Sequence, residues 1–214
     1  QCCSRFQDVS DPWRVLHWSD VSVGVNLLLY EVLGWSDFAE AITTHMDRWL
    51  HDVPRTPKGL AYLMEWGTNR FAAAAAFQAL VAADLGLNAQ PYRVFAVQQI
   101  FYMLGDCCID PATGKSTMSH LVGFGPAWPR SVHHRGSTCD SKGHCSCTIN
   151  ANVHTVWGGL IGGPDKQDQF SAEGCSDFIR NEVAIDYNAA FLSAVAGLEA
   201  LSLAGTLQQY ISNG

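Results

Sequence analysis

Basic side chains are scarce in this sequence of 214 residues, which has 13 Lys and Arg against 20 Asp and Glu and a formal net charge of -7. They form no cluster, so the charge pattern argues against nucleic acid and against an anionic membrane as partners. Long apolar runs are missing too, because none approaches the roughly 18 residues of a membrane span. A neutral or cationic ligand suits this charge balance better.

Strand-like alternation of any length is also missing, and apolar residues instead recur at helical spacing. Between Trp18 and Leu33, and again between Phe38 and Leu50, they repeat every three or four positions. This spacing predicts two helices, the first of which ends at Gly34. His45 lies on the apolar stripe of the second helix, where we expect a core histidine rather than a ligand.

Three further helices are predicted downstream. The interval 68–85 contains five consecutive alanines, with Thr68 as a candidate N-cap. The interval 91–104 begins with a proline, which the first turn of a helix tolerates. A final helix is predicted from Asn188, another candidate N-cap, past Leu201. The pattern as a whole indicates an all-α fold.

The sequence has eight cysteines, including the adjacent pairs Cys2-Cys3 and Cys107-Cys108. This is a high count for a reducing compartment, so we predict disulfides in a secreted, extracellular protein. No signal peptide remains at Gln1, and the abrupt start before Cys2-Cys3 is consistent with a processing cut.

Zinc is the alternative for the cysteines of the middle region. The possible ligands are Cys139, Cys145 and Cys147 with one of His133, His134, His144 and His154. The intervals between these cysteines do not match those of the usual zinc knuckle. No compact acidic cluster has the spacing of a calcium loop either. We therefore predict no metal and no cofactor.

The segment from Gly105 to about Ser176 is rich in Gly, Pro, Ser, His and Cys and has no helical periodicity. Loops of this length in a compact domain are usually functional or held by disulfides. Within it, His133 and Arg135 are two residues apart, so in an extended segment both point to the same side. They would then present hydrogen-bond donors to hydroxyl groups or to a developing charge, unless they are plain surface residues.

Glu182 is the candidate catalytic acid. It lies among apolar neighbours just before the predicted final helix, where loss of water disfavours the anion and keeps a carboxyl protonated. A general acid needs such a protonated carboxyl. The alternative is an ordinary surface acid on a helix.

Several motifs together resemble the family 9 glycoside hydrolases, in the order that this family has them. They are PRTPKGL at 54–60, EWG at 65–67, VGFG at 122–125, HHR at 133–135, GGPD at 162–165 and NEVAIDYNA at 181–189. The resemblance covers the chain from about Trp18 onward. It implies endo-β-1,4-glucanase activity with inversion, carried by an (α/α)6 barrel.

The resemblance makes Glu182 the proton donor to the glycosidic oxygen. It also implies sugar contacts or ordering roles for His133, Arg135 and Tyr187, and stacking platforms at Trp18 and Trp66. Either indole could instead be a plain core residue. The sequence departs from the family pattern in two places. Near Glu173 the chain is one residue longer ahead of Phe178, and the segment from Cys107 to Ser119 is longer than expected.

The catalytic base is missing. An inverting glycosidase needs a second carboxylate about 6.5–9.5 Å from the acid, so that a water fits between them. The family takes this base from an Asp-Ala-Gly-Asp motif in its N-terminal half, and the sequence lacks that motif. Residues 1–214 therefore resemble the C-terminal half of the catalytic domain.

Half a barrel leaves apolar helix flanks exposed at its two edges. We therefore expect about six helices and a long disulfide-held loop region, completed by a second chain that carries the N-terminal half. The expected substrate is a β-glucan. The alternative function is a non-catalytic glucan-binding or structural subunit that has lost the base.

Overall fold

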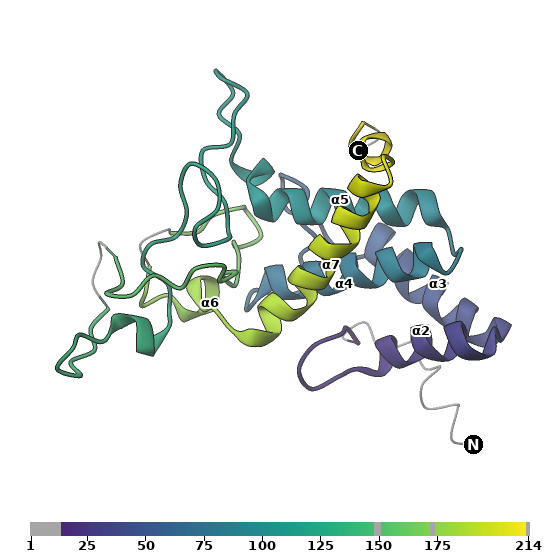
Figure 1. Cartoon of the computed structure of the whole chain (residues 1–214), viewed down its shortest axis with the longest axis horizontal. Helices are drawn as coiled ribbons and strands as arrows, with labels where there is room; N and C mark the ends of the chain where they lie inside the picture. Colours follow the sequence, from purple (N-terminus) through teal and green to yellow (C-terminus); the bar gives the residue numbers. More distant parts are fainter. Residues whose placement is uncertain (1–13, 148–150, 172–173, 213–214) are drawn as a thin grey trace.

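The computed structural model describes residues 14–147, 151–171 and 174–212 (Figure 1). Its long helices are α2 (Ser22–Leu33), α3 (Ser36–His51), α4 (Thr68–Asp84), α5 (Ala89–Leu104) and α7 (Ile185–Leu203). The short ones are η1 (Asp106–Cys108), η2 (Arg135–Thr138), α6 (Phe178–Asn181) and α8 (Leu207–Ile211). Strand pairing in these ranges is limited to isolated bridges, which confirms the all-α prediction.

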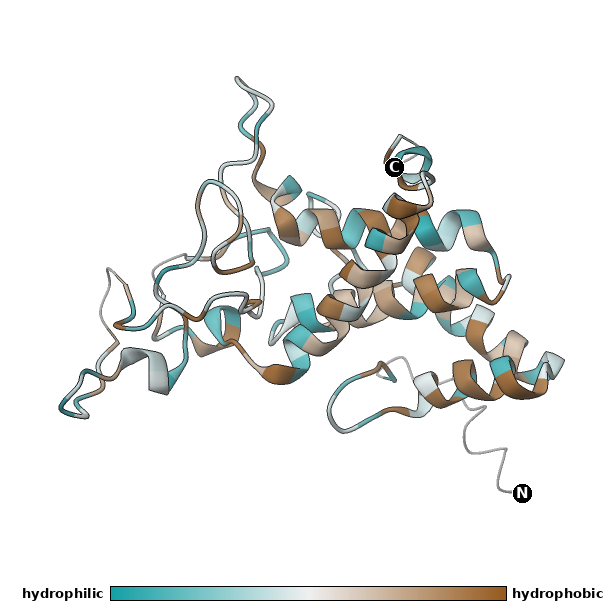
Figure 2. Ribbon diagram, viewed as in Figure 1, coloured by the Kyte–Doolittle hydropathy of each residue, from teal (hydrophilic) through white to brown (hydrophobic). Residues whose placement is uncertain are grey.

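The helices pack around α4, which contacts α5 on one side and α7 on another. The five alanines Ala72 to Ala76 are all fully buried at 0% exposure. Because alanine side chains are small, neighbouring helices can approach this helix closely. Apolar residues recur along all the long helices in Figure 2. None of the helices in the described part of the chain has the length and apolar character needed to span a bilayer.

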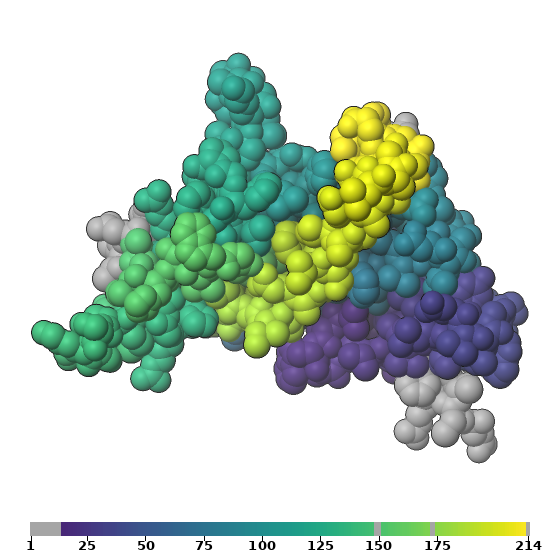
Figure 3. Space-filling model, in the orientation of Figure 1, coloured from purple at the N-terminus to yellow at the C-terminus, as the bar shows by residue number. Residues whose placement is uncertain are grey.

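The chain between α5 and α6 forms a separate mass of loops beside the helices (Figures 1 and 3). It has a small apolar core of its own, made of Val122, Val132, Ile161 and Val183. Disulfides join Cys139 to Cys145 and Cys147 to Cys175, as predicted for a disulfide-held loop. These bonds use all three cysteines of the alternative zinc site.

Both predicted N-caps are wrong. Thr68 is the first helical residue of α4, and the cap position belongs to Gly67, whose φ is 73°. The final helix begins at Ile185, three residues before Asn188. The Asn188 side chain instead bonds the loop region, since it accepts from the Leu160 N–H at 3.1 Å and donates to the Gly158 carbonyl at 2.6 Å.

His45 on α3 is a core residue, as expected, with 3% of its surface exposed. Burial lowers the pKa of its imidazole to about 4, because the charged ring would lose its water. The negative charge of Asp20 acts in the opposite direction, but burial is the larger effect.

This buried imidazole predicts a loss of stability in acid. Its pKa is lower in the folded state than in the unfolded chain, so the unfolded state binds the extra proton first. The contribution is complete above about pH 6.5 and is lost as the pH falls toward 4. From the shift, we expect His45 to lower the free energy of unfolding by roughly 3 kcal/mol across that window.

The measurement is urea unfolding of the wild-type protein and of His45→Leu at several pH values. The variant should show a shallower fall in unfolding free energy between pH 6.5 and 4. His51→Leu is the matched control, because His51 is an exposed histidine on the same helix. If His45→Leu and His51→Leu have equal pH slopes, the buried imidazole has no such effect.

Candidate active site

Glu182 lies in the short connection between α6 and α7, in an extended conformation with φ -62° and ψ 139°. Two bridges hold this connection against the loop region. One pairs Glu182 with His133, and the other pairs Val183 with Ile161. In addition, the His133 N–H donates to the Asn181 carbonyl at 2.7 Å. The backbone of the candidate acid is therefore fixed before its side chain makes any contact.

Two donors hold the carboxyl group of Glu182 at one oxygen. Its Oε2 accepts from the indole N–H of Trp66 at 2.9 Å and from the hydroxyl of Tyr187 at 2.7 Å. Burial and the hydrogen bond to Glu182 both raise the pKa of Tyr187, so its hydroxyl keeps its proton at neutral pH. Within the part of the chain that the structure describes, no donor bonds Oε1.

The carboxyl group opens into a cleft of about 330 Å³. The cleft is lined by Trp18, Trp66, Arg70, Glu182, Ala184, Asp186 and Tyr187. Trp18 is 76% exposed and Trp66 is 46% exposed, so neither indole is a core residue. The structure thus brings four of the predicted site residues together: Glu182, Tyr187, Trp18 and Trp66.

An ion pair in the same cleft was missed from the sequence. The Arg70 guanidinium contacts the Asp186 carboxylate at 3.0 Å, and the two side chains are 13% and 22% exposed. The guanidinium also lies 5.0 Å from the centre of the Tyr187 ring. The sequence signal for this ion pair was weak, because it consisted of an acidic residue in the first turn of the last long helix. Asp186 is therefore a second carboxylate near Glu182, but it already forms an ion pair with Arg70.

His133 is oriented by the loop disulfide. Its Nδ1 lies 2.8 Å from the carbonyl oxygen of Cys175, which can only accept, so Nδ1 carries the proton. The other ring nitrogen, Nε2, then has a lone pair available as an acceptor. The ring centre lies 5.9 Å from that of Phe178. Because Cys175 is bonded to Cys147, the disulfide restrains the Cys175 carbonyl, and this carbonyl in turn orients the His133 ring.

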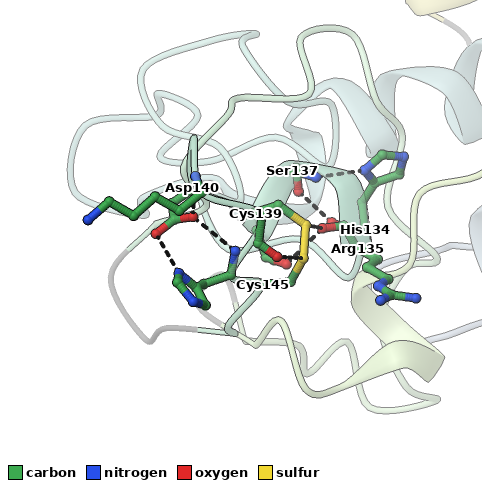
Figure 4. Close-up of a disulfide and its surroundings, with 10 residues drawn as sticks. His134, Arg135, Ser137, Cys139, Asp140 and Cys145 are labelled. Carbon is green, nitrogen blue, oxygen red and sulfur yellow. Dashed lines mark hydrogen bonds and ion pairs between the residues drawn. A yellow bond between two sulfur atoms is a disulfide. The ribbon is translucent and has the colours of Figure 1, made fainter.

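Arg135 departs from the expected geometry. The extended conformation ends at His134, and Arg135 opens η2, so the two-residue alternation with His133 does not apply. The His134 ring accepts from the Ser137 N–H at 3.2 Å. Figure 4 shows the His134 and Arg135 side chains projecting away from the Cys139–Cys145 disulfide. Arg135 is exposed, and within the described ranges the hydrogen bonds to the Glu182 carboxyl come from Trp66 and Tyr187, not from Arg135.

Comparison with known proteins agrees with this arrangement. The family model of glycosyl hydrolase family 9 matches residues 4–195. The chain belongs to glycosyl hydrolase family 9. It is 35% identical to Endoglucanase A of Bacillus pumilus over 193 residues, which is 85% of this chain and 28% of that protein. It is 31% identical to an endoglucanase of Dictyostelium discoideum over 188 residues, or 85% and 24% of the two chains.

Solved family 9 structures share the fold. The endoglucanase of the termite Nasutitermes takasagoensis superposes with a TM-score of 0.82 and 37% identity, over 94% of this chain and 45% of that one. The cellulase Cel9M of C. cellulolyticum in complex with cellobiose gives a TM-score of 0.76 and 31% identity, over 87% and 41%. The chain therefore spans less than half of these relatives. It corresponds to a C-terminal part of an (α/α)6 barrel, which confirms the family and fold predictions.

Gly67 provides a test of this geometry. At its φ of +73° a side chain is strained, and a Cβ there would lie 3.0 Å from the Tyr187 hydroxyl that bonds Glu182. Gly67→Ala should therefore lower the free energy of unfolding by the backbone cost of about 1–2 kcal/mol and by a further amount for the displaced tyrosine.

Gly205→Ala is the matched control. Gly205 has a φ of +70°, but a Cβ there would meet nothing within 4 Å. Urea unfolding of both variants measures the difference. Equal losses would mean that Tyr187 is not confined by the start of α4.

Proposed function

We propose that this chain supplies the general acid, Glu182, for the hydrolysis of internal β-1,4-glucosidic bonds in cellulose or a related β-glucan with inversion. The observation that carries the proposal is the carboxyl group of Glu182, which is bonded at one oxygen only and lies in an open cleft. Endoglucanases among the relatives support the choice of substrate.

The two hydrogen bonds to Glu182 suit proton donation. In the reaction, the carboxylic acid gives its proton to the leaving glycosidic oxygen and becomes a carboxylate. The donors Trp66 and Tyr187 are already in place to stabilise the negative charge that forms on it. They also fix the rotation of the side chain, so Oε1 is the atom that faces the substrate oxygen.

Sugar binding falls to the exposed aromatic and polar groups around the acid. Indole faces pack against the apolar faces of sugar rings, and Trp18 and Trp66 both lie open on the cleft. We also assign His133 a sugar contact, because its backbone pairs with that of Glu182 and its Nε2 can accept a hydrogen bond from a sugar hydroxyl. Arg135 remains a sugar contact only if substrate or a companion polypeptide reorients it.

Water activation has to come from elsewhere. Asp186 is engaged by Arg70 and follows Glu182 closely in the chain, so it is poorly suited to act from the opposite face of the sugar ring. A companion polypeptide with the N-terminal half of the barrel would bring the base. The disulfides support a secreted, extracellular setting for the assembly.

Replacing Glu182 with Gln tests the acid role in the assembled enzyme. Glutamine keeps the size of the side chain but cannot donate an acidic proton, so hydrolysis of carboxymethyl cellulose should fall by about 100- to 10,000-fold. A cellobioside with a dinitrophenyl leaving group needs no protonation to depart. Its hydrolysis by Glu182→Gln should fall much less.

The control is Glu40→Gln, which changes an exposed glutamate on α3 that does not line the cleft. It should leave both activities unchanged. An equal loss on both substrates in Glu182→Gln would argue for a structural role. If the wild-type assembly binds glucan but never cleaves it, the non-catalytic subunit is the correct function.

Exposed apolar side chains on α2 and α7 support the proposal of a companion chain. On α2, Leu28 is 61% and Val32 is 78% exposed, and on α7, Leu192 is 68% and Leu203 is 82% exposed. Such apolar surface is usually covered by a partner. Since the chain covers only 45% of the termite enzyme, the remaining helices of that barrel are the natural cover.

Gel filtration under native conditions, followed by denaturing electrophoresis, tests this assembly. We expect the chain to elute with a second polypeptide of comparable size that carries an Asp-Ala-Gly-Asp motif. Leu192→Lys, on the exposed flank of α7, should weaken the association, whereas His51→Lys, at an exposed position on α3, should not. A soluble, monodisperse monomer with full activity would contradict the assembly.

A further inference from the structure

A pair of adjacent cysteines lies just after α5, outside the cleft. Cys107 and Cys108 lie in η1, and their Sγ atoms lie 2.6 Å apart without a bond between them. Cys107 is 2% exposed, whereas Cys108 is partly open to solvent. The other described cysteines, Cys139, Cys145, Cys147 and Cys175, are all in disulfides.

A buried histidine faces this pair. His120 is 0% exposed, and its Nε2 lies 3.6 Å from the Sγ of Cys107. Its Nδ1 lies 3.0 Å from the Nδ2 of Asn69, and that same amide nitrogen donates to the Ile161 carbonyl at 3.0 Å. The Ile161 carbonyl accepts only, so it fixes the amide nitrogen in this place. The Oδ1 of Asn69 lies farther from Nδ1 of His120, at 3.4 Å, so the closer contact makes Nδ1 an acceptor and places the ring proton on Nε2, directed at Cys107.

The tautomer of His120 decides whether Cys107, Cys108 and His120 suit metal binding or thiol–disulfide chemistry. The two sulfurs and the imidazole nitrogen lie within 4.8 Å of one another, which is close enough to hold a soft metal ion. However, a metal needs the Nε2 lone pair, and in this arrangement Nε2 carries a hydrogen. A hydrogen-bond donor beside a sulfur instead suits thiol and disulfide chemistry.

We propose that Cys107 and Cys108 are a thiol–disulfide exchange site, which small disulfides such as glutathione disulfide oxidise to a vicinal Cys107–Cys108 disulfide. The pair needs little rearrangement, because the sulfurs are already within 2.6 Å. Chemistry of this kind fits a chain whose remaining described cysteines are oxidised.

The two sulfurs have different roles in the exchange. A hydrogen bond from Cys107 lowers the pKa of the Cys108 thiol, and Lys58 acts in the same direction. The Cys108 thiolate attacks one sulfur of the small disulfide, forms a mixed disulfide and releases one thiol. Cys107 then gives its proton to the thiolate that left first and attacks the Sγ of Cys108, which releases the second thiolate; that thiolate takes a proton from water. The protein dithiol loses two electrons, and the small disulfide gains them.

Peptide mapping tests the oxidised state directly. The protein is purified without reductant, denatured with N-ethylmaleimide and cut with trypsin, which releases residues 94–115 with both cysteines on one peptide. We expect this peptide to be unlabelled and lighter by two hydrogens, and to take two maleimides only after reduction. Two labels without reduction would overturn the proposal. So would a disulfide from this peptide to the one that carries Cys2 and Cys3.

Serine variants test the order of attack in the protein reduced and then exposed to glutathione disulfide. Cys107→Ser should accumulate one glutathione adduct on Cys108, because no second sulfur resolves it. Cys108→Ser should remain without adduct, since Cys107 is buried. The reverse pattern would contradict the assigned roles. The peptide map of the wild-type protein needs no variant, so the proposal stays testable if either serine form fails to fold.

Discussion

The contact between α4 and α7 is the constraint on which the site depends. Small side chains on α4 let the two helices approach, and this contact brings the first turn of α7 next to the start of α4. Gly67 completes the approach, because a Cβ there would lie 3.0 Å from the Tyr187 hydroxyl. Trp66 directly precedes Gly67. The same contact therefore delivers both donors, Trp66 and Tyr187, to the carboxyl group of Glu182.

A second constraint acts from the loop region, whose described residues pair only through isolated bridges. Its order comes from close backbone contacts that only glycine permits. A Cβ on Gly162 would lie 2.6 Å from the Ile179 carbonyl oxygen, and one on Gly163 would lie 2.7 Å from the Asn69 side chain. The Asn69 N–H also donates to the Gly162 carbonyl at 2.8 Å. This explains why a Gly-Gly pair stands at this point, where α4, α6 and the loop region meet.

The long helices and the family were predictable because they depend on repeated local patterns. Apolar spacing identified α2 to α5 and α7, and the run of motifs identified glycosyl hydrolase family 9. The N-caps failed for a reason that sequence does not contain. Asn188 has the side chain of a good cap, but the loop around Gly158 and Leu160 recruits its amide, so the helix starts earlier. Cap preference is local, whereas this recruitment joins residues about thirty positions apart.

The residues of the candidate site were likewise only partly predictable from the sequence. Motif matching found Glu182, Tyr187, Trp18 and Trp66, and the structure gathers them in one cleft. It also implied a sugar contact for Arg135, and strand alternation predicted that Arg135 points to the same side as His133. The η2 turn that begins at Arg135 removes this alternation.

The surroundings of Glu182 were also only half predictable. Apolar neighbours in the sequence suggested a carboxyl held in an apolar pocket, whereas its actual neighbours at the carboxyl are an indole N–H and a phenol. The pair of Arg70 and Asp186 was invisible because its partners are far apart in the chain and on different helices.

The proposed division of the barrel between two polypeptides is compatible with the proposed inverting mechanism. The acid and base of an inverting glycosidase lie about 6.5–9.5 Å apart with water between them, so neither carboxylate needs to bond the other. Every described contact that orients Glu182 comes from this chain: the bridge to His133, the Trp66 indole and the Tyr187 hydroxyl. The acid can therefore be positioned completely within one half. On the proposed assembly, the companion chain would supply the second carboxylate and the opposite wall, and the exposed apolar flanks of α2 and α7 would align it.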